Sequence, residues 1–330
     1  MESFRAFIVE KEGDRCVTRV GAITENELPP GDVTIRVAYS CVNFKDGLAV
    51  LADGKIVSRY PFIPGIDLSG TVVRSDDERY REGDRVLVTG YGLGVSREGG
   101  YSELARVPGD WVVPLPDGLS LREAMIVGTA GFTAALSIER LREQGVLPDR
   151  GPVAVAGATG GVGSMAVALL AALGYEVVAG SGKADAADYL RELGASSVVS
   201  REELAGTVRK PLQKERWAGA IDPVGGAGLA GLLSAVRYGG TVAVSGLTGG
   251  ADVPTTVYPF ILRGVSLLGI DSVQCPRDLR ERMWRRLARE WKPSGGYERL
   301  VAEETGLDGL ARPLAAIVQG GLKGRVLVRI

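Results

Sequence analysis

The clearest chemical signal in the sequence is a glycine-rich stretch, residues 157–164 (GATGGVGS). It stands between an apolar run typical of a buried strand (152–156, PVAVA) and a run typical of a buried helix (163–174, GSMAVALLAALG). In a strand–turn–helix unit such glycines allow a tight turn, and the helix N-terminus offers N–H groups to a pyrophosphate. A turn that serves only helix–sheet packing is the alternative. The context favours a dinucleotide site.

The end of the next predicted strand (176–180, EVVAG) indicates which dinucleotide binds. An NAD site normally has Asp or Glu there, to accept from the ribose hydroxyl. This chain has Ser181, Gly182 and Lys183 instead, and Arg201 follows the short strand 197–200. A hydroxyl and two cations suit a 2′-phosphate, so the sequence predicts NADPH. The alternative is that Lys183 and Arg201 are solvated surface charges.

Composition excludes several other chemistries. The chain contains no histidine, which rules out a Ser-His-Asp hydrolase and a His-ligated zinc site. Three scattered cysteines form no disulfide framework or CxxC pair. The 39 basic and 40 acidic residues nearly balance, so we expect no nucleic-acid partner and no membrane anchor. The charged N-terminus and the lack of an uninterrupted apolar run of about 18 residues predict a cytoplasmic protein.

The elements that position these residues predict an α/β fold with two domains. Residues 1–115 read as short strands between Gly, Pro and Asp turns. Ser120 and Glu123 have capping-box spacing and open a predicted helix that runs to about Arg142. Beyond it, apolar strands alternate with helices, which predicts a doubly wound parallel sheet. The segments 310–321 and 323–330 read as a helix and a strand that return to the first domain.

Several stretches together resemble the medium-chain dehydrogenase/reductase superfamily. They are 42–50 (VNFKDGLAV), 60–73 (YPFIPGIDLSGTVV), 83–90 (GDRVLVTG), 99–120, 128–136 (GTAGFTAAL) and the glycine turn. The stretches 125–135, 217–226, 254–273 and 323–328 are similar to the acrylyl-CoA reductase (NADPH) branch, a group also labelled quinone oxidoreductase. The resemblance implies a GroES-like β-barrel domain over 1–122, completed by 298–330. A Rossmann NADPH-binding domain would span 123–297.

The resemblance also implies a set of cofactor contacts. Carried over position by position, they are Phe44, Thr159, Gly160, Gly161, Val162, Ser181, Gly182, Lys183, Arg201, Leu247, Ile261, Ser272 and Arg325. Close relatives often have tyrosine where this chain has Phe44, so no hydrogen bond or proton donation is expected there.

For catalysis the resemblance points to Asn43 and Lys45, at the start of a short helix that faces the cofactor cleft in this superfamily. Asn43 would donate to a carbonyl oxygen or fix the nicotinamide, and Lys45 would stabilise an enolate or meet a CoA phosphate. In the alternative interpretation Asn43 only caps the helix, and Lys45 and Asp46 are surface residues. Tyr60, Tyr91 and water are alternative proton donors. Lys55 and Arg59 are further candidates for CoA phosphates.

The resemblance further implies metal-free chemistry. Zinc-dependent members carry Gly-His-Glu where this chain has Gly65, Ile66 and Asp67, and Cys41, near a zinc-ligand position, is predicted to be a buried apolar residue. The implied reaction is reduction of acrylyl-CoA to propionyl-CoA by NADPH. A quinone or general enone reductase and a non-catalytic NADPH-binding redox sensor are the alternatives. Strand 265–271 (VSLLGID) is expected to pair across a homodimer.

Overall fold

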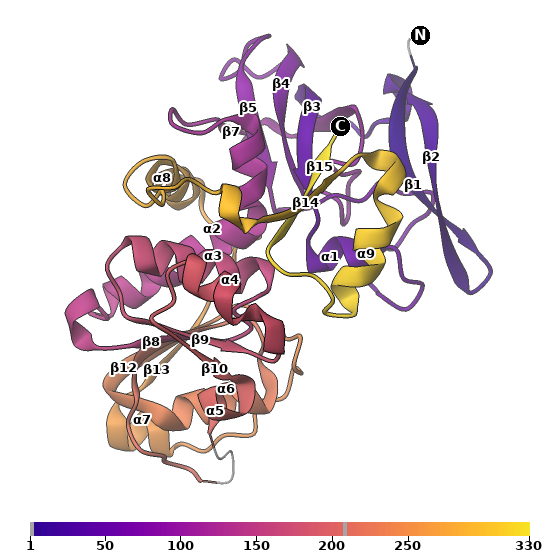
Figure 1. Ribbon diagram of the computed structural model, residues 1–330. Helices are drawn as coiled ribbons and strands as arrows, with labels where there is room; N and C mark the ends of the chain where they lie inside the picture. The colour runs from indigo at the N-terminus through magenta and orange to yellow at the C-terminus, as the bar shows by residue number, and fades with distance from the viewer. Residues whose placement is uncertain (1–2, 207–209) are drawn as a thin grey trace. The chain divides into compact units, whose positions relative to one another are not determined.

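A computed structural model describes residues 3–206 and 210–330 as two compact units (Figure 1). The first unit comprises residues 1–129, 273–288 and 301–330, and the second comprises 130–272 and 289–300. The predicted domains place the boundaries at 122/123 and 297/298 and leave residues 273–288 in the Rossmann part. The domain boundaries therefore stay a prediction.

The first unit is built on antiparallel strands. A seven-stranded sheet has the order β14-β15-β3-β4-β5-β7, with β6 paired to β3, and β1 and β2 form a separate hairpin. The strands are β1 (Ser3–Glu12), β2 (Arg15–Thr24), β3 (Val33–Cys41), β4 (Asp67–Ser75), β5 (Arg85–Thr89), β6 (Leu104–Val107), β7 (Val113–Pro114), β14 (Val301–Thr305) and β15 (Arg325–Arg329). The C-terminal β15 pairs with β3, Leu327 opposite Cys41, so the end of the chain completes this sheet.

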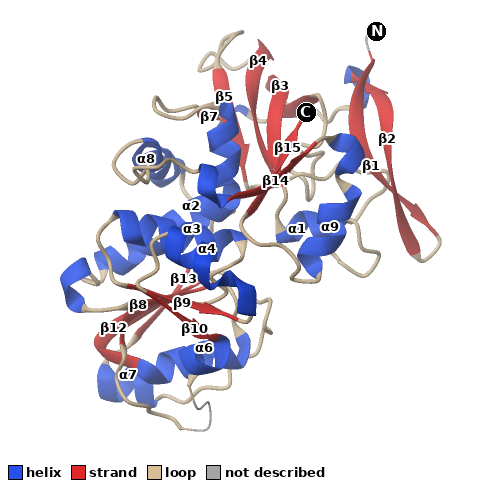
Figure 2. Cartoon of the chain, viewed as in Figure 1, coloured by secondary structure: helices blue, strands red, loops and turns tan. Residues whose placement is uncertain are grey.

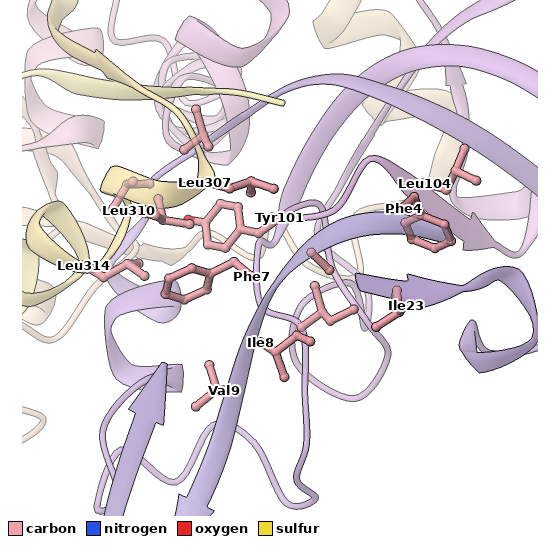
Figure 3. Close-up of a cluster of buried hydrophobic side chains, with 14 of the residues drawn as sticks. Phe4, Phe7, Ile8, Val9, Ile23, Tyr101, Leu104, Leu307, Leu310 and Leu314 are labelled. Carbon is pink, nitrogen blue, oxygen red and sulfur yellow. The ribbon is translucent and has the colours of Figure 1, made fainter. Parts of the chain in front are cut away.

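The helices of the first unit are short, apart from α8. They are α1 (Phe44–Ala49), α8 (Arg277–Ala288) and α9 (Ala311–Val318). An apolar cluster joins β1 to the C-terminal segment (Figure 3). In it the rings of Phe7 and Tyr101 meet edge to face at 6.3 Å, and Leu310 and Leu314 pack against the same cluster. Burial of these side chains holds the C-terminal segment against the N-terminal hairpin.

The second unit is a parallel sheet covered by helices on both faces, with α3 and α4 on one face and α6 and α7 on the other (Figure 2). The strand order is β10-β9-β8-β11-β12-β13. Its strands are β8 (Val153–Val155), β9 (Val177–Ser181), β10 (Ser197–Ser200), β11 (Trp217–Asp222), β12 (Val236–Val244) and β13 (Ser266–Gly269). Its helices are α3 (Gly161–Ala172), α4 (Ala187–Glu192), α5 (Arg201–Ala205), α6 (Gly226–Ala235) and α7 (Tyr258–Arg263). The predicted combination of a GroES-like domain and a doubly wound parallel sheet is confirmed.

The predicted helix from Ser120 is α2 (Leu121–Glu143). Its capping box is present, since Ser120 N donates to Glu123 Oε2 at 3.0 Å and Glu123 N donates to Ser120 Oγ at 3.1 Å. The helix bends at Gly128, whose φ is 49°. By length and composition α2 is apolar enough to cross a membrane, but 78% of its most apolar window is buried inside the protein, as in a core helix.

Three features of the first and second units differ from the sequence expectations. β2 and β14 were not expected, because neither stretch is a continuous apolar run. The sequence over 229–239 (LAGLLSAVRYG) is typical of one helix, but in the structure α6 ends at Ala235 and Val236 begins β12. β-branched Val236 suits the strand, and Gly239 and Gly240 break the helical pattern.

Candidate functional site

The glycine turn has the geometry of a phosphate cradle. β8 runs into the turn, where Gly157 takes a φ of 54°, and Gly160 is the N-cap of α3. A Cβ on Gly163 would collide with the carbonyl oxygen of Gly157, so only glycine lets the helix start against the turn. Gly160 is exposed and Gly161 and Val162 are half-buried, so the first turn of α3 is accessible. Thr159, which is also a predicted cofactor contact in the glycine turn, is buried.

The residues predicted to bind a 2′-phosphate lie together. Ser200 and Ser181 are register partners at the carboxyl ends of β10 and β9, which brings Arg201 beside residues 181–183. A Cβ built on Gly182 would lie 2.5 Å from Cζ of Arg201, so the guanidinium lies directly over this glycine. Ser181 Oγ accepts from Lys183 N at 3.0 Å. The structure therefore brings the Arg201 guanidinium beside Ser181, Gly182 and Lys183. The same guanidinium also pairs with the exposed Glu202 at 3.6 Å.

Leu247 and Ser272 also follow carboxyl ends of the sheet. Leu247 lies in the loop after β12, where Ser245 N donates to Asp222 O at 2.9 Å, and it is exposed. Ser272 follows β13, and its hydroxyl accepts from Thr133 Oγ1 at 2.9 Å. Both positions are compatible with the cofactor contacts that the resemblance implies.

Ile261 lies elsewhere in the second unit. It is on α7, where Arg263 bonds to Gln213 O at 2.5 Å and to Ser234 O at 2.9 Å, in the segments that precede β11 and β12. This end of α7 is therefore at the amino edge of the sheet, opposite the glycine turn. Ile261 itself is 68% exposed, and the cofactor contact predicted for it stays a prediction.

In the first unit, the predicted site residues fall into a buried polar network. Asp67 Oδ2 accepts from Asn43 Nδ2 at 2.9 Å, from Cys41 Sγ at 3.1 Å and from Thr129 N at 2.7 Å. Arg325 Nη2 donates to Cys41 Sγ at 3.0 Å and to Asn43 Oδ1 at 3.3 Å. We call Cys41, Asn43, Asp67, Thr129 and Arg325 the Asp67–Arg325 network.

Arg325 and Asn43 are both buried members of this network. Arg325 is 2% exposed, and its guanidinium donates to Ile126 O and Cys41 Sγ inside the unit. The cofactor contact predicted for it stays a prediction. Asn43 is 8% exposed, and both ends of its amide are engaged by Asp67 and Arg325. The direct roles predicted for Asn43 stay predictions.

Asp46, a surface residue in the alternative interpretation of the sequence, is fully buried. Its carboxylate accepts from the backbone N–H groups of Asn43 (2.9 Å), Gly65 (3.1 Å) and Ile66 (2.9 Å). Burial and the nearby Asp67 raise the pKa of Asp46 to about 7. The same carboxylates, after burial, hold the pKa of Tyr101 well above its usual range. The capping spacing of Asn43 and Asp46 was the signal in the sequence that could have revealed this role.

Phe44 and Lys45 are the first residues of α1 and are half-buried. Lys45 is thus the predicted catalytic residue that retains access to solvent.

The two tyrosines considered as alternative proton donors are packed against other side chains. Burial and Cys16 raise the pKa of Tyr60 to about 12, and Tyr91 stacks on Trp111 with ring centroids 5.5 Å apart. Arg59 is bound by Glu98 at 2.6 and 2.8 Å.

Comparisons with known proteins identify the family of the chain. Residues 29–117 match the family model "Alcohol dehydrogenase GroES-like domain", and residues 161–289 match "Zinc-binding dehydrogenase". The chain is 55% identical over 327 residues to the putative quinone oxidoreductase YhfP of Bacillus subtilis, covering 99% of both chains. It is 50% identical over 329 residues to the acrylyl-CoA reductase AcuI of Ruegeria pomeroyi, also covering 99% of both.

Solved structures of similar proteins contain nicotinamide dinucleotides. The YhdH oxidoreductase of Salmonella enterica, solved with NADP, superposes with a TM-score of 0.95 at 48% identity, covering 99% of both chains. YhfP was solved with NAD and superposes with a TM-score of 0.97 over the whole of both chains. The prediction of NADPH is confirmed at the level of the family.

The zinc that the name of one family model implies does not fit these residues. The chain has no histidine, and residues 3–206 and 210–330 contain no group of three or more His, Cys, Asp or Glu suited to a metal. The Cys41 sulfur is in contact with the Arg325 guanidinium. The chain belongs to the medium-chain dehydrogenase/reductase superfamily, in its quinone oxidoreductase and acrylyl-CoA reductase group of NADPH-dependent oxidoreductases.

Proposed function

We propose that this protein reduces an activated C=C bond with NADPH, and that acrylyl-CoA is its substrate. The observation that carries the proposal is the Ser181, Lys183 and Arg201 arrangement, which suits a 2′-phosphate, in a chain 50% identical to an acrylyl-CoA reductase. NADPH supplies a hydride when bound. The β-carbon of the enoyl thioester accepts that hydride, a proton adds to the α-carbon, and propionyl-CoA is the product.

The residues of the second unit bind the cofactor in this proposal. The N–H groups at the start of α3 face the pyrophosphate, because the first four N–H groups of a helix have no intrahelical acceptor. Arg201 and Lys183 hold the 2′-phosphate by charge-assisted hydrogen bonds. Leu247 and Ser272 contact the nicotinamide end.

Lys45 is the residue that we assign to the substrate. Hydride addition places negative charge on the thioester oxygen, and an ammonium group beside that oxygen stabilises the enolate. Asn43 begins the turn that presents Lys45, and its side chain is held from behind by Asp67 and Arg325. Water supplies the proton, since Tyr60 and Tyr91 are packed against other side chains.

A quinone is the second candidate acceptor, because the relative at 55% identity is named a putative quinone oxidoreductase. The deciding experiment follows NADPH oxidation with acrylyl-CoA, crotonyl-CoA and a benzoquinone in parallel. We expect the highest kcat/KM with acrylyl-CoA. Quinone turnover without thioester turnover would refute the acrylyl-CoA assignment and leave the quinone reductase.

We also propose that the protein acts as a cytoplasmic homodimer. Support comes from β13, which is the outermost strand of the parallel sheet, and from the apolar side chains exposed on it and on α7.

A further inference from the structure

The bend in α2 is held by two oppositely charged side chains. Arg325 Nε donates to the carbonyl oxygen of Ile126 at 3.0 Å, two residues before Gly128. One residue after it, Thr129 donates its backbone N–H to Asp67 Oδ2 at 2.7 Å and its hydroxyl to Asp67 Oδ1 at 2.5 Å. A cation and an anion therefore hold the two sides of one bend.

The same two side chains lie among sulfur and oxygen atoms of a kind that binds a cation. Around the guanidinium stand Cys41 Sγ at 3.0 Å, Asn43 Oδ1 at 3.3 Å, and the carbonyl oxygens of Ile126 at 3.0 Å and Val42 at 3.4 Å. The Asp67 carboxylate contacts Cys41 Sγ and Asn43 Nδ2 from the other side. Sulfur, carboxylate and carbonyl oxygens are also ligands of divalent metals.

We infer that the Arg325 guanidinium is an internal cation that occupies the space a metal ion would need and that fixes Cys41, Asn43 and the α2 bend. Three observations support this role. Arg325 is buried, its donors point at the four groups named above, and the approach is too close for a side chain at Gly128. A Cβ there would lie 2.7 Å from Asp67 Oδ2, 2.8 Å from Cys41 Sγ and 2.9 Å from Arg325 Nη2.

The inference makes Arg325 a positioning residue of an oxidoreductase that needs no metal. Metal uptake requires that a carboxylate and a thiolate face an open space, and binding releases the thiol proton to solvent. With Arg325 in place, its guanidinium occupies the space beside Cys41 Sγ and Asn43 Oδ1. Removal of the side chain leaves sulfur and oxygen ligands with no cation.

The test measures Co²⁺ binding to the purified full-length chain, with no NADPH or acceptor present, so its outcome is independent of the proposed function. We expect Arg325→Ala to take up one Co²⁺ per chain, with thiolate-to-cobalt absorption in the near ultraviolet. The wild type and Arg329→Ala, an exposed arginine of the same strand, should take up none. Cys41→Ala added to Arg325→Ala should remove the sulfur absorption.

Three results would overturn the inference: a folded Arg325→Ala that binds no Co²⁺, a wild type that binds Co²⁺ with the sulfur absorption, or a double variant that retains this absorption. If Arg325→Ala does not fold, added methylguanidinium should restore its thermal transition, and failure to do so counts against the inference. Arg325→Lys retains a cation and should bind no Co²⁺.

Discussion

The carboxylate of Asp67 accepts two hydrogen bonds from Thr129, one from the backbone N–H at 2.7 Å and one from the hydroxyl at 2.5 Å. Both groups are at the start of the second half of α2, just after the bend at Gly128. Asp67 therefore acts as a buried cap from a neighbouring strand. An anion at a helix N-terminus is stabilising, and more so where water is excluded.

Thr129→Val should destabilise the protein because it keeps the shape of the side chain and removes the hydroxyl donor. A hydrogen bond to a charged group contributes about 1.5–3 kcal/mol, so we expect the free energy of unfolding to fall by roughly that amount. Urea denaturation measures it. Thr129→Ser is the matched control, since it retains the donor. An equal loss in both variants would show that packing of the methyl group, rather than the bond to Asp67, is responsible.

Gly128→Ala should destabilise the protein more than Gly145→Ala. Both glycines have positive φ, 49° and 77°, so both substitutions cost about 1 kcal/mol or more of backbone strain. At Gly145 an added Cβ meets nothing within 4 Å, whereas at Gly128 it meets the Asp67–Arg325 network. We expect a further loss of about 1–3 kcal/mol at Gly128 from overpacking. Thermal and urea unfolding of the pair check this, and equal losses would contradict the close approach.

The sequence predicted the second unit better than the first-unit site. A strand, a glycine turn and a helix are local patterns, so β8, Gly157 and α3 were found, as was the strand end at Ser181. The contact of Arg201 with Gly182 follows from the parallel register of β9 and β10, which neighbouring βαβ units impose.

The Asp67–Arg325 network could not be predicted in this way. Its members are brought together by pairings between residues up to 284 positions apart, such as Arg325 with Cys41. Asp46 was missed for another reason. Helix-surface spacing suggests exposure, but three backbone N–H groups converge on its carboxylate from two different segments. Local periodicity carries no information on such convergence.

Asp46 should make stability depend on pH. Its pKa is about 7 in the folded protein, above the ordinary value of 3.8, so the folded state binds the proton more tightly than the unfolded state. The contribution of Asp46 to the free energy of unfolding is therefore complete below about pH 4 and is lost as pH rises through 7. Linkage puts the change on the order of 2–4 kcal/mol.

The measurement compares wild type with Asp46→Asn by urea denaturation at several pH values between 5 and 8. The amide of Asp46→Asn does not titrate, and its N–H groups would oppose the Asn43 N–H. The variant should therefore be less stable than wild type at every pH in this range. The difference between the two proteins should shrink as pH rises. Asp14→Asn, at an exposed turn, should show a constant difference from wild type. A pH-independent difference for Asp46→Asn would contradict the shifted pKa.

Arg201→Ala should weaken the binding of NADPH and leave the binding of NADH nearly unchanged. Loss of one charge-assisted hydrogen bond to the 2′-phosphate is worth about 1.5–3 kcal/mol, so we expect KM for NADPH to rise by roughly 10- to 100-fold. Adding Lys183→Ala to Arg201→Ala should raise the KM for NADPH further. Arg191→Ala, which removes an exposed arginine that pairs with Asp188, is the charge-matched control. Equal losses for NADPH and NADH would refute the 2′-phosphate assignment.

The homodimer prediction can be tested at the β13 edge. Val257, Ile261 and Leu262 are more than half exposed, at 62%, 68% and 56%, and lie close in sequence to the unpaired edge of β13. Such an edge with apolar neighbours invites pairing with a second copy. Ile261→Glu with Leu262→Glu should therefore convert a dimer to a monomer in size-exclusion chromatography with light scattering. Leu147→Glu removes an exposed leucine elsewhere in the second unit and should leave the mass unchanged. If the wild type is a monomer at micromolar concentration, or if the double variant stays dimeric, this face is not the subunit interface.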